Sequence, residues 1–496
     1  MRKVYILLCT VFALGVSSCS DWLDVRPETE QKDKDMFSTY DGFCDALTGC
    51  YMSLASQEIY GERLTMTHIE SLANLWHMPS SLSETNRQAD WVLKHHEYTS
   101  TYAEDAIETM YAKLFNVVVQ ANMIIKNIDE RGEQVILDPD IRSVIQGEAY
   151  AIRAYCQLDI LRLFGQVPQG VQKVELPYSE TTSIYEVPAY YDFDSYVGKL
   201  EYDLQKAMSL LKDKDPVFEM SFDELNSGGT AGVDEFMLYR QSRLNYWAVK
   251  ALEARMYLYI GNREKANKAA MEVIDAKLDG QSVMTMSGVN DFALGYKLCP
   301  SECLFYLSKY NVLTYSQAFL IGGNTRVTYD SRSHLVLTSA MFDELYDGQN
   351  INSHNRYWNI WNREVEYGGN TYVATTKYYW NQDNVTSPML HYQIIPMLRM
   401  SEVYLIALET TDVLDDANRL YQSYMQAHSV SDMADFATLE EVKPFIIGEY
   451  RREFIAEGQM FYTYKRTATL DMMWCDDPME EQDYILPLPR TEYNPN

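Results

Sequence analysis

A long apolar stripe between residues 104 and 129 constrains the fold of this chain more than any other feature. Apolar side chains recur there at intervals of three and four residues, which is the spacing of one face of an α-helix. A second helix is predicted from about Ile141 to Phe164, ended by Gly165 and Pro168. Only the polar segment 131–139 separates the two, so they should form a hairpin. The stripe consists of Ile107, Met110, Tyr111, Leu114, Phe115, Val118, Asn122 and Ile125.

Similar helical hairpins are predicted further along the chain. Residues 243–260 and 263–276 flank a Gly-Asn break. The small and large residues Ala254, Tyr257, Ala266 and Val273 match those of a tetratricopeptide (TPR) unit, in which small residues let two helices approach. We therefore expect a mainly α-helical scaffold of TPR-like hairpins. The other predicted helical segments are 37–54, the pair 396–409 and 413–427, and 438–457, which ends at Gly458.

Long segments between the hairpins lack any sustained helical period. They are richer in Gly, Pro, Asn, Ser, Trp and Tyr than the hairpins are. We expect them to form irregular excursions and a few short strands packed on the scaffold. Long irregular segments on a rigid frame are also where binding surfaces usually lie. These excursions span residues 71–103, 166–195, 213–240 and 280–395.

Two of the excursions combine aromatic rings with amide and basic side chains. The whole chain has 39 Tyr, 17 Phe and 8 Trp, an excess of the aromatic residue that also carries a polar tip. Ring faces can stack on sugars or peptide side chains, while amides and Arg bind hydroxyls. The alternative is that each ring only anchors a loop to the core. The predicted ligand contacts are Trp76, His77, Asn86 and Trp91 near 71–103, and Trp358, Trp361, Arg363 and Tyr372 within 280–395.

The N-terminus has the layout of a bacterial lipoprotein signal. Arg2 and Lys3 precede a short apolar run, and small residues lead to Cys19. The alternative is an ordinary signal peptide with an unrelated cysteine. On the lipoprotein interpretation, residues 1–18 are removed, Cys19 is lipidated, and 19–36 form a tether to a single domain over 37–496. Such a protein is anchored to a membrane without spanning it.

Composition and motifs argue against several other functions. A net charge of -29 disfavours nucleic acid and anionic lipid as partners. No phosphate-binding Gly loop, HExxH, GxSxG or EF-hand loop is present, so we predict no enzyme, no catalytic residue and no metal or cofactor site. A glycosidase carboxylate pair stays open among 71 acidic residues. The acidic composition also allows a structural Ca²⁺ site, although no DxDxD spacing marks one.

The cysteines that follow the signal show no metal-binding spacing. None forms a CxxC pair, and Cys299 and Cys303 have no nearby His. We expect scattered free thiols, with a Cys44–Cys50 bridge as the alternative. The six positions are Cys44, Cys50, Cys156, Cys299, Cys303 and Cys475.

Several separated blocks, in order along the mature chain, resemble the SusD/RagB family of outer-membrane lipoproteins. One departure stands out, because the run after Gly458 lacks the family's first Arg and its Asp, which suggests a divergent branch. The matching positions are Cys19, Trp22 and Leu23; Gly147, Glu148, Arg153, Phe164 and Gly165; Arg399, Glu402 and Glu409; Glu449, Arg452, Glu453 and Gly458; and Pro487 and Pro489.

This resemblance implies a surface-exposed, lipid-anchored protein of the outer membrane that captures nutrient oligomers. It also implies a partner, a SusC-like TonB-dependent β-barrel transporter over which the lipoprotein lies as a lid. Oligosaccharides are the expected ligands, with oligopeptides as the alternative and a lipid-anchored glycoside hydrolase or a TPR-like adaptor as more distant ones. The charged residues of the family blocks are expected to be structural ion pairs, which are weak evidence for function.

Overall fold

A computed structural model describes residues 35–79, 81, 83–183, 186–229, 232–320, 335–367, 369–380 and 391–493. The signal, Cys19 and most of the tether lie outside these residues. The chain is mainly helical with a few short strands, as the sequence predicts. Within the described parts, the search for a helix with the length and apolar character of a membrane span returned none.

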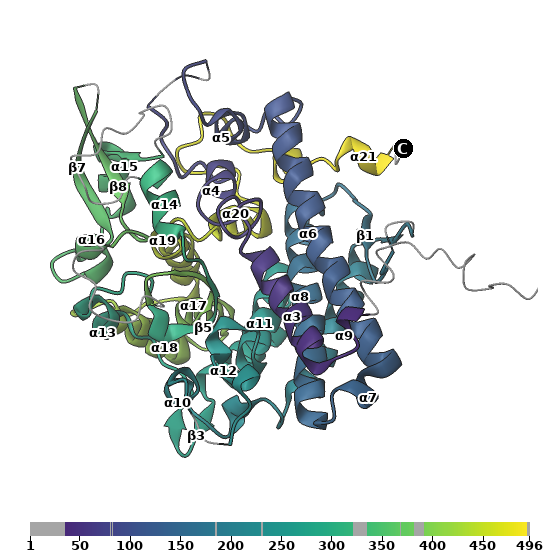
Figure 1. The fold of residues 1–496 in the computed structure, drawn as a ribbon. Coiled ribbons are helices and arrows are strands. Elements are labelled where there is room, and N and C mark those ends of the chain that lie inside the picture. Colours follow the sequence, from purple (N-terminus) through teal and green to yellow (C-terminus); the bar gives the residue numbers. More distant parts are fainter. Residues whose placement is uncertain are drawn as a thin grey trace, which may run out of the picture.

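Three long helices form one flank of the molecule (Figure 1). They are α6 (Thr101–Asn127), α8 (Pro139–Phe164) and α9 (Phe193–Leu211), and each packs on the next. Asp138 begins α8 by accepting the backbone N–H groups of Asp140 and Ile141 at 2.8 and 3.1 Å. At Gly147 of α8 a Cβ would lie 2.9 Å from Leu211 Cγ, so a glycine lets α8 and α9 approach closely.

The other predicted hairpins are present. They pair α11 (Tyr246–Tyr259) with α12 (Arg263–Ile274), and α17 (Met400–Thr410) with α18 (Leu414–Ala427). The four TPR-like positions in the first of these pairs are all at most 5% exposed, which confirms their role in helix packing. α12 also packs on α17, so the two hairpins stack into one scaffold.

One predicted helical boundary is wrong. Residues 394–399 form strand β9 (Ile394–Arg399), antiparallel to β5 (Cys303–Ser308), before α17 begins at Met400. Every residue of β9 is buried, so its sequence lacks the alternation of apolar and polar residues that would indicate a strand. Helix α9 is a further element that the sequence analysis did not identify.

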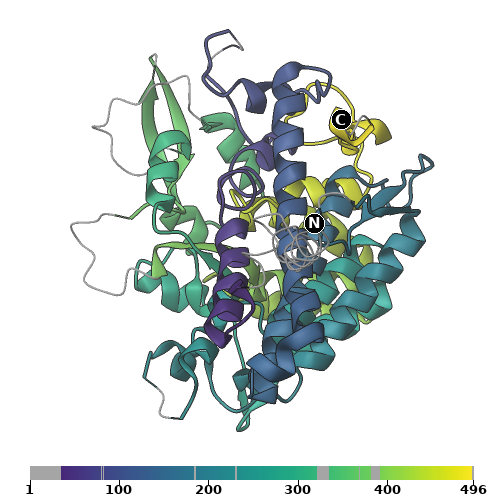
Figure 2. The ribbon, with the colours of Figure 1, turned by 45° about the vertical axis from the view of Figure 1, so that its right-hand side comes forward.

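The later excursion carries a small sheet on the opposite flank from α6 (Figure 2). Strand β8 (Asn370–Thr375) lies between β6 (Leu337–Thr338) and β7 (Trp361–Tyr367), antiparallel to both. The short helices α15 (Ser339–Leu345) and α16 (Asn355–Asn359) pack beside this sheet.

The remaining elements are short except for α3 and α19. Helices are α3 (Tyr40–Leu54), α4 (His68–Leu72), α5 (Gln88–Lys94), α7 (Glu133–Val135), α10 (Phe222–Asn226), α13 (Gly288–Ala293), α14 (Val312–Tyr315), α19 (Val442–Glu453), α20 (Met460–Arg466) and α21 (Arg490–Tyr493), with the 3-10 turn η5 (Pro300–Glu302); strands are β1 (Leu176–Tyr178), β2 (Ala189–Tyr191), β3 (Lys277–Leu278) and β4 (Gln281–Ser282).

All six cysteines of the described chain are free thiols. The alternative of a Cys44–Cys50 bridge is therefore wrong. Both residues lie on α3 six positions apart, where a helix places their side chains on different faces.

Buried ion pairs hold the scaffold together, as predicted for the family blocks. Arg240 lies between Glu148 and Asp215, and all three side chains are fully buried. Arg255 pairs with Glu402 at 2.6 Å and so ties α11 to α17. Such residues fix how the helices pack and have no surface to offer a ligand.

Candidate ligand-binding face

The two aromatic excursions meet at one short bridge. The backbone N–H of His77 donates to the carbonyl of Val336 at 2.7 Å, and Val336 N–H donates back at 3.2 Å. The His77 ring stacks on Tyr372 of β8, with ring centroids 5.7 Å apart. The structure thus brings together two of the predicted contacts from segments almost 300 residues apart in sequence.

Three of the predicted contacts are buried and unavailable for stacking. Trp76 is 0% exposed, and its Nε1–H donates to the Met66 carbonyl at 3.0 Å. Trp361 is 7% exposed and donates to the Tyr346 hydroxyl at 3.0 Å. Tyr372 is 8% exposed beneath His77. These rings anchor the excursions to the core and offer little or no surface for stacking in this structure, so their role as direct ligand contacts stays a prediction.

Trp358 has the opposite environment. Its side chain is 52% exposed, more than that of any other tryptophan in the described ranges. Its Nε1–H donates to the Ile351 carbonyl at 2.8 Å, and the Arg363 guanidinium lies 4.7 Å from its ring centroid. Arg363 lies equally close to the Tyr357 ring. The indole is therefore both held in place and open to solvent, as a stacking platform for a sugar must be.

Asn86 and Trp91 belong to a different part of the surface, around α5. Asn86 is exposed beside a cavity of about 310 Å³. Trp91 is half-buried, with its ring 5.1 Å from that of His95. The cavity is bordered by Gln57, Glu62, Arg63, His68, Arg87, Gln88, Asp90, Tyr102, Asp105 and Thr109 as well as Asn86.

A buried ion network forms the floor of this cavity. Arg87 Nη2 lies 2.9 Å from Glu62 Oε1, Arg87 Nε lies 2.5 Å from Asp90 Oδ2, and His68 Nδ1 lies 2.7 Å from Asp90 Oδ1. Burial alone would raise the pKa of Asp90, but Arg87 and His68 hold it below its ordinary value. The Asp90 carboxylate is therefore held in its charged form next to the amide and hydroxyl side chains that border the cavity.

Tyr102 is a rim residue that the sequence analysis missed. It is 45% exposed at the start of α6. The buried face of α6 continues through Ala103, Ala106 and Ile107, so position 102 points away from it. Tyr102 precedes the helix predicted over 104–129, so the predicted stripe carried no signal for it.

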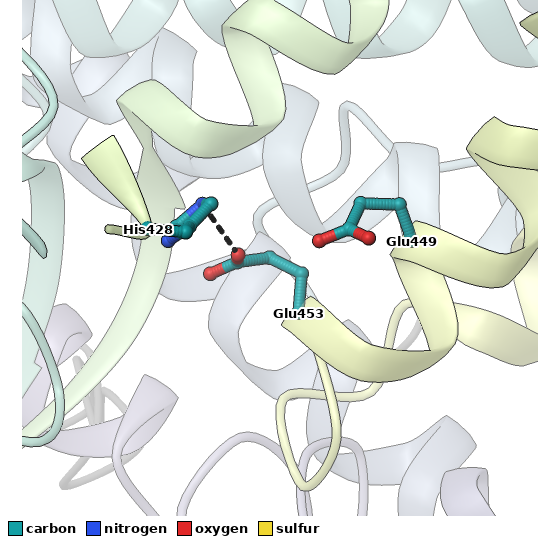
Figure 3. A group of neighbouring side chains, drawn as sticks. All are labelled: His428, Glu449 and Glu453. Atoms are coloured by element: carbon teal, nitrogen blue, oxygen red, sulfur yellow. Dashed lines mark ion pairs between the residues drawn. The ribbon is translucent and has the colours of Figure 1, made fainter. Parts of the chain in front are cut away.

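One group of side chains has the composition of a metal site. His428, at the end of α18, lies beside Glu449 and Glu453 of α19 (Figure 3). The Arg356 guanidinium lies between them, with Nη1 2.7 Å from Glu449 Oε1 and Nη2 in contact with Glu453 and His428. Burial and Arg356 hold the pKa of His428 well below its ordinary value. A guanidinium already supplies the positive charge here, so the group does not fit a metal ion.

The family described as "Starch-binding associating with outer membrane" matches residues 21–221. A curated relative, the SusD-like protein P2 of Formosa agariphila, is 21% identical over 99% of this chain and 97% of its own length. A SusD superfamily protein of Bacteroides thetaiotaomicron superposes with a TM-score of 0.68 at 20% identity, covering 92% of this chain and 98% of that one. The chain resembles SusD-like proteins in sequence, and it shares the fold of their solved structures.

A laminarin-binding SusD-like protein also shares the fold, with a TM-score of 0.63 at 14% identity over 92% of this chain and 97% of its own. At these identities the solved structures bear on the fold alone. The fold explains why the sequence blocks that resemble this family are charged yet buried. They carry the ion pairs between hairpins, while the excursions carry the exposed rings and amides.

Proposed function

We propose that this chain is a SusD-like protein and that it binds glycan oligosaccharides on the face formed by its two aromatic excursions. The observation that carries the proposal is Trp358, an indole fixed by Ile351 and Arg363 and left 52% exposed. A preordered aromatic platform loses little conformational freedom when a sugar ring stacks on it. The starch-binding description of the family and the laminarin-binding relative support the same class of ligand.

We further propose that the protein delivers its ligand to a TonB-dependent outer-membrane transporter and acts as the lid of that barrel. A lipid at Cys19 would keep it at the outer membrane. The description of the family as associating with the outer membrane supports this placement. In this role no bond of the ligand is made or broken.

The binding proposal is tested by replacing Trp358 with Ala and measuring affinity by calorimetry for oligosaccharides of laminarin and starch. Loss of a stacking platform costs about 1–3 kcal/mol, so affinity should fall roughly 5- to 150-fold. The matched control is Tyr202→Ala, because Tyr202 on α9 is 53% exposed but lies on the helical scaffold. It should leave affinity unchanged.

Two results would overturn the glycan assignment. One is equal affinity of the Trp358→Ala variant and the unaltered protein for every glycan bound. The other is binding of oligopeptides with no glycan bound, which would favour a peptide carrier. Co-purification of a β-barrel with the unaltered protein tests the delivery step separately.

A further inference from the structure

Lys297 lies in the loop between α13 and η5 with an incompletely satisfied ammonium group. Its Nζ donates to Thr376 Oγ1 at 2.9 Å and lies 5.9 Å from the Tyr379 ring centroid. An ammonium has three N–H donors, and this one has a single hydrogen-bond acceptor among the described residues. The side chain is half-buried, so part of it still reaches solvent.

No carboxylate of the described chain lies within ion-pair distance of Lys297. Acidic residues outnumber basic ones by 71 to 42 over the whole sequence. Two buried lysines, Lys377 and Lys465, are well supplied with acceptors. Lys377 contacts Glu457 and two backbone carbonyls, and Lys465 donates to three carbonyls at the end of α8. The Lys297 ammonium has fewer acceptors than either of these two.

Neighbouring groups also lack hydrogen-bond partners. Trp380 Nε1 and His391 Nδ1 are buried and unpartnered. They belong to one aromatic cluster with Lys297, because Trp380 packs on Tyr392 at 5.7 Å, Tyr392 on Tyr296 at 5.2 Å, and Tyr296 on His391 at 4.7 Å. Tyr296 directly precedes Lys297. The cluster therefore places an unpartnered indole N–H and an unpartnered imidazole nitrogen within an apolar wall.

This cluster adjoins the Trp358 platform. Thr376 N–H donates to the Ile360 carbonyl at 2.7 Å, and Thr376 Oγ1 lies 3.5 Å from the Asn359 carbonyl. Asn359 is the residue after Trp358 in α16. The hydroxyl that accepts from Lys297 is thus held against the helix that presents the indole.

We propose that Lys297, with Thr376 and the Tyr379 ring, forms a subsite for a carboxylate or sulfate group of the glycan, so that the natural ligand is an acidic oligosaccharide. A half-buried cation without a counter-charge is costly, and an anionic sugar would supply that charge. Burial lowers the pKa of Lys297 to about 8, which agrees with a missing counter-ion. The inference rests on the proposed glycan function and adds the charge of the ligand.

The first test compares trigalacturonic acid, a sulfated galactan trisaccharide and neutral galactotriose as probes. Lysines are labelled by reductive methylation with isotope-labelled methyl groups, and the Lys297 resonance is assigned from its absence in Lys297→Gln. We expect a saturable shift of this resonance with one or both acidic probes and none with the neutral one. The resonance of Lys199, which pairs with Glu180 at 2.6 Å, is the internal control. A shift of the Lys297 resonance with trigalacturonic acid alone indicates a carboxylate subsite, and a shift with the sulfated trisaccharide alone indicates a sulfate subsite.

The second test measures affinity. Charge-assisted hydrogen bonds are worth about 1.5–3 kcal/mol, so Lys297→Gln should weaken binding of the acidic probe roughly 10- to 150-fold. Binding of neutral laminarin oligosaccharides should not change. An unmoved Lys297 resonance with all three probes, or equal weakening for acidic and neutral sugars, would overturn the subsite. If either result is obtained while Trp358→Ala still loses binding of neutral glucans, the subsite is wrong but the proposed glycan function is supported.

Discussion

Replacing Arg399 with Met tests whether the charged family blocks are structural. The Arg399 guanidinium reaches three carboxylates, with Nη1 2.6 Å from Glu302, Nη2 2.6 Å from Glu453 and Nε 2.9 Å from Glu457. All four side chains are at most 4% exposed. Met has a similar length but no charge, so the variant leaves three buried carboxylates without the positive charge of Arg399.

The expected loss in the free energy of unfolding follows from these contacts. Removing one partner of a buried ion pair costs about 3–5 kcal/mol. Unfolding entropy is about 2.1 cal/mol/K per residue, or about 1 kcal/mol/K for a chain of this length. Tm should therefore fall by about 3–5 °C. Scanning calorimetry measures this shift, and chemical denaturation measures the free energy of unfolding at one temperature.

The control is Arg419→Met, because Arg419 is 55% exposed and pairs with Asp416 on the same helix at 3.2 Å. Exposed pairs contribute about 0–1 kcal/mol, so Tm should move by no more than about 1 °C. If Arg399→Met does not fold, Arg399→Lys keeps the charge without the forked geometry and should lose less stability. Equal Tm shifts for Arg399→Met and Arg419→Met would refute the reasoning, as would lost glycan binding at unchanged stability.

Two further predictions concern pH and anchoring. Burial raises the pKa of Glu70 from 4.5 to about 8, and its Oε2 has no hydrogen-bond partner. Because the folded-state pKa exceeds the unfolded one, stability should fall as pH rises from about 4.5 to about 8. Glu70→Gln should flatten that part of the Tm–pH curve, and an unchanged slope would contradict the assignment. Cys19→Ala should leave glycan binding by the purified protein intact but abolish retention in the outer-membrane fraction, and normal retention would disprove the lipid anchor.

The helical scaffold was largely predictable because its signals are local. Apolar spacing and Gly breaks placed α6, α8, α11 and α12 within a few residues of their ends. Helix α9 was missed although Tyr196, Leu200, Leu204 and Leu211 carry the same spacing. Strand β9 was misassigned because its conformation depends on pairing with β5, about ninety residues earlier in the sequence.

The binding face was predictable only in part. Composition located the two excursions, but it could not tell which aromatic rings face the solvent. Trp358 and Trp361 are three positions apart, yet one is 52% exposed and the other 7%. Lys297 carried no sequence signal at all, since its distinguishing property is the lack of a nearby carboxylate.

The contacts made by α20 constrain when the protein can fold. Lys465 of α20 donates to the carbonyls of Arg162 and Gly165 at the end of α8, and Leu486 N–H donates to the Leu163 carbonyl at 3.1 Å. These partners are about 300 residues apart. During synthesis from the N-terminus, these carbonyls at the end of α8 gain their partners only when the last part of the chain emerges. A chain truncated before Lys465 would leave these carbonyls without these partners, so the end of α8 should be less stable.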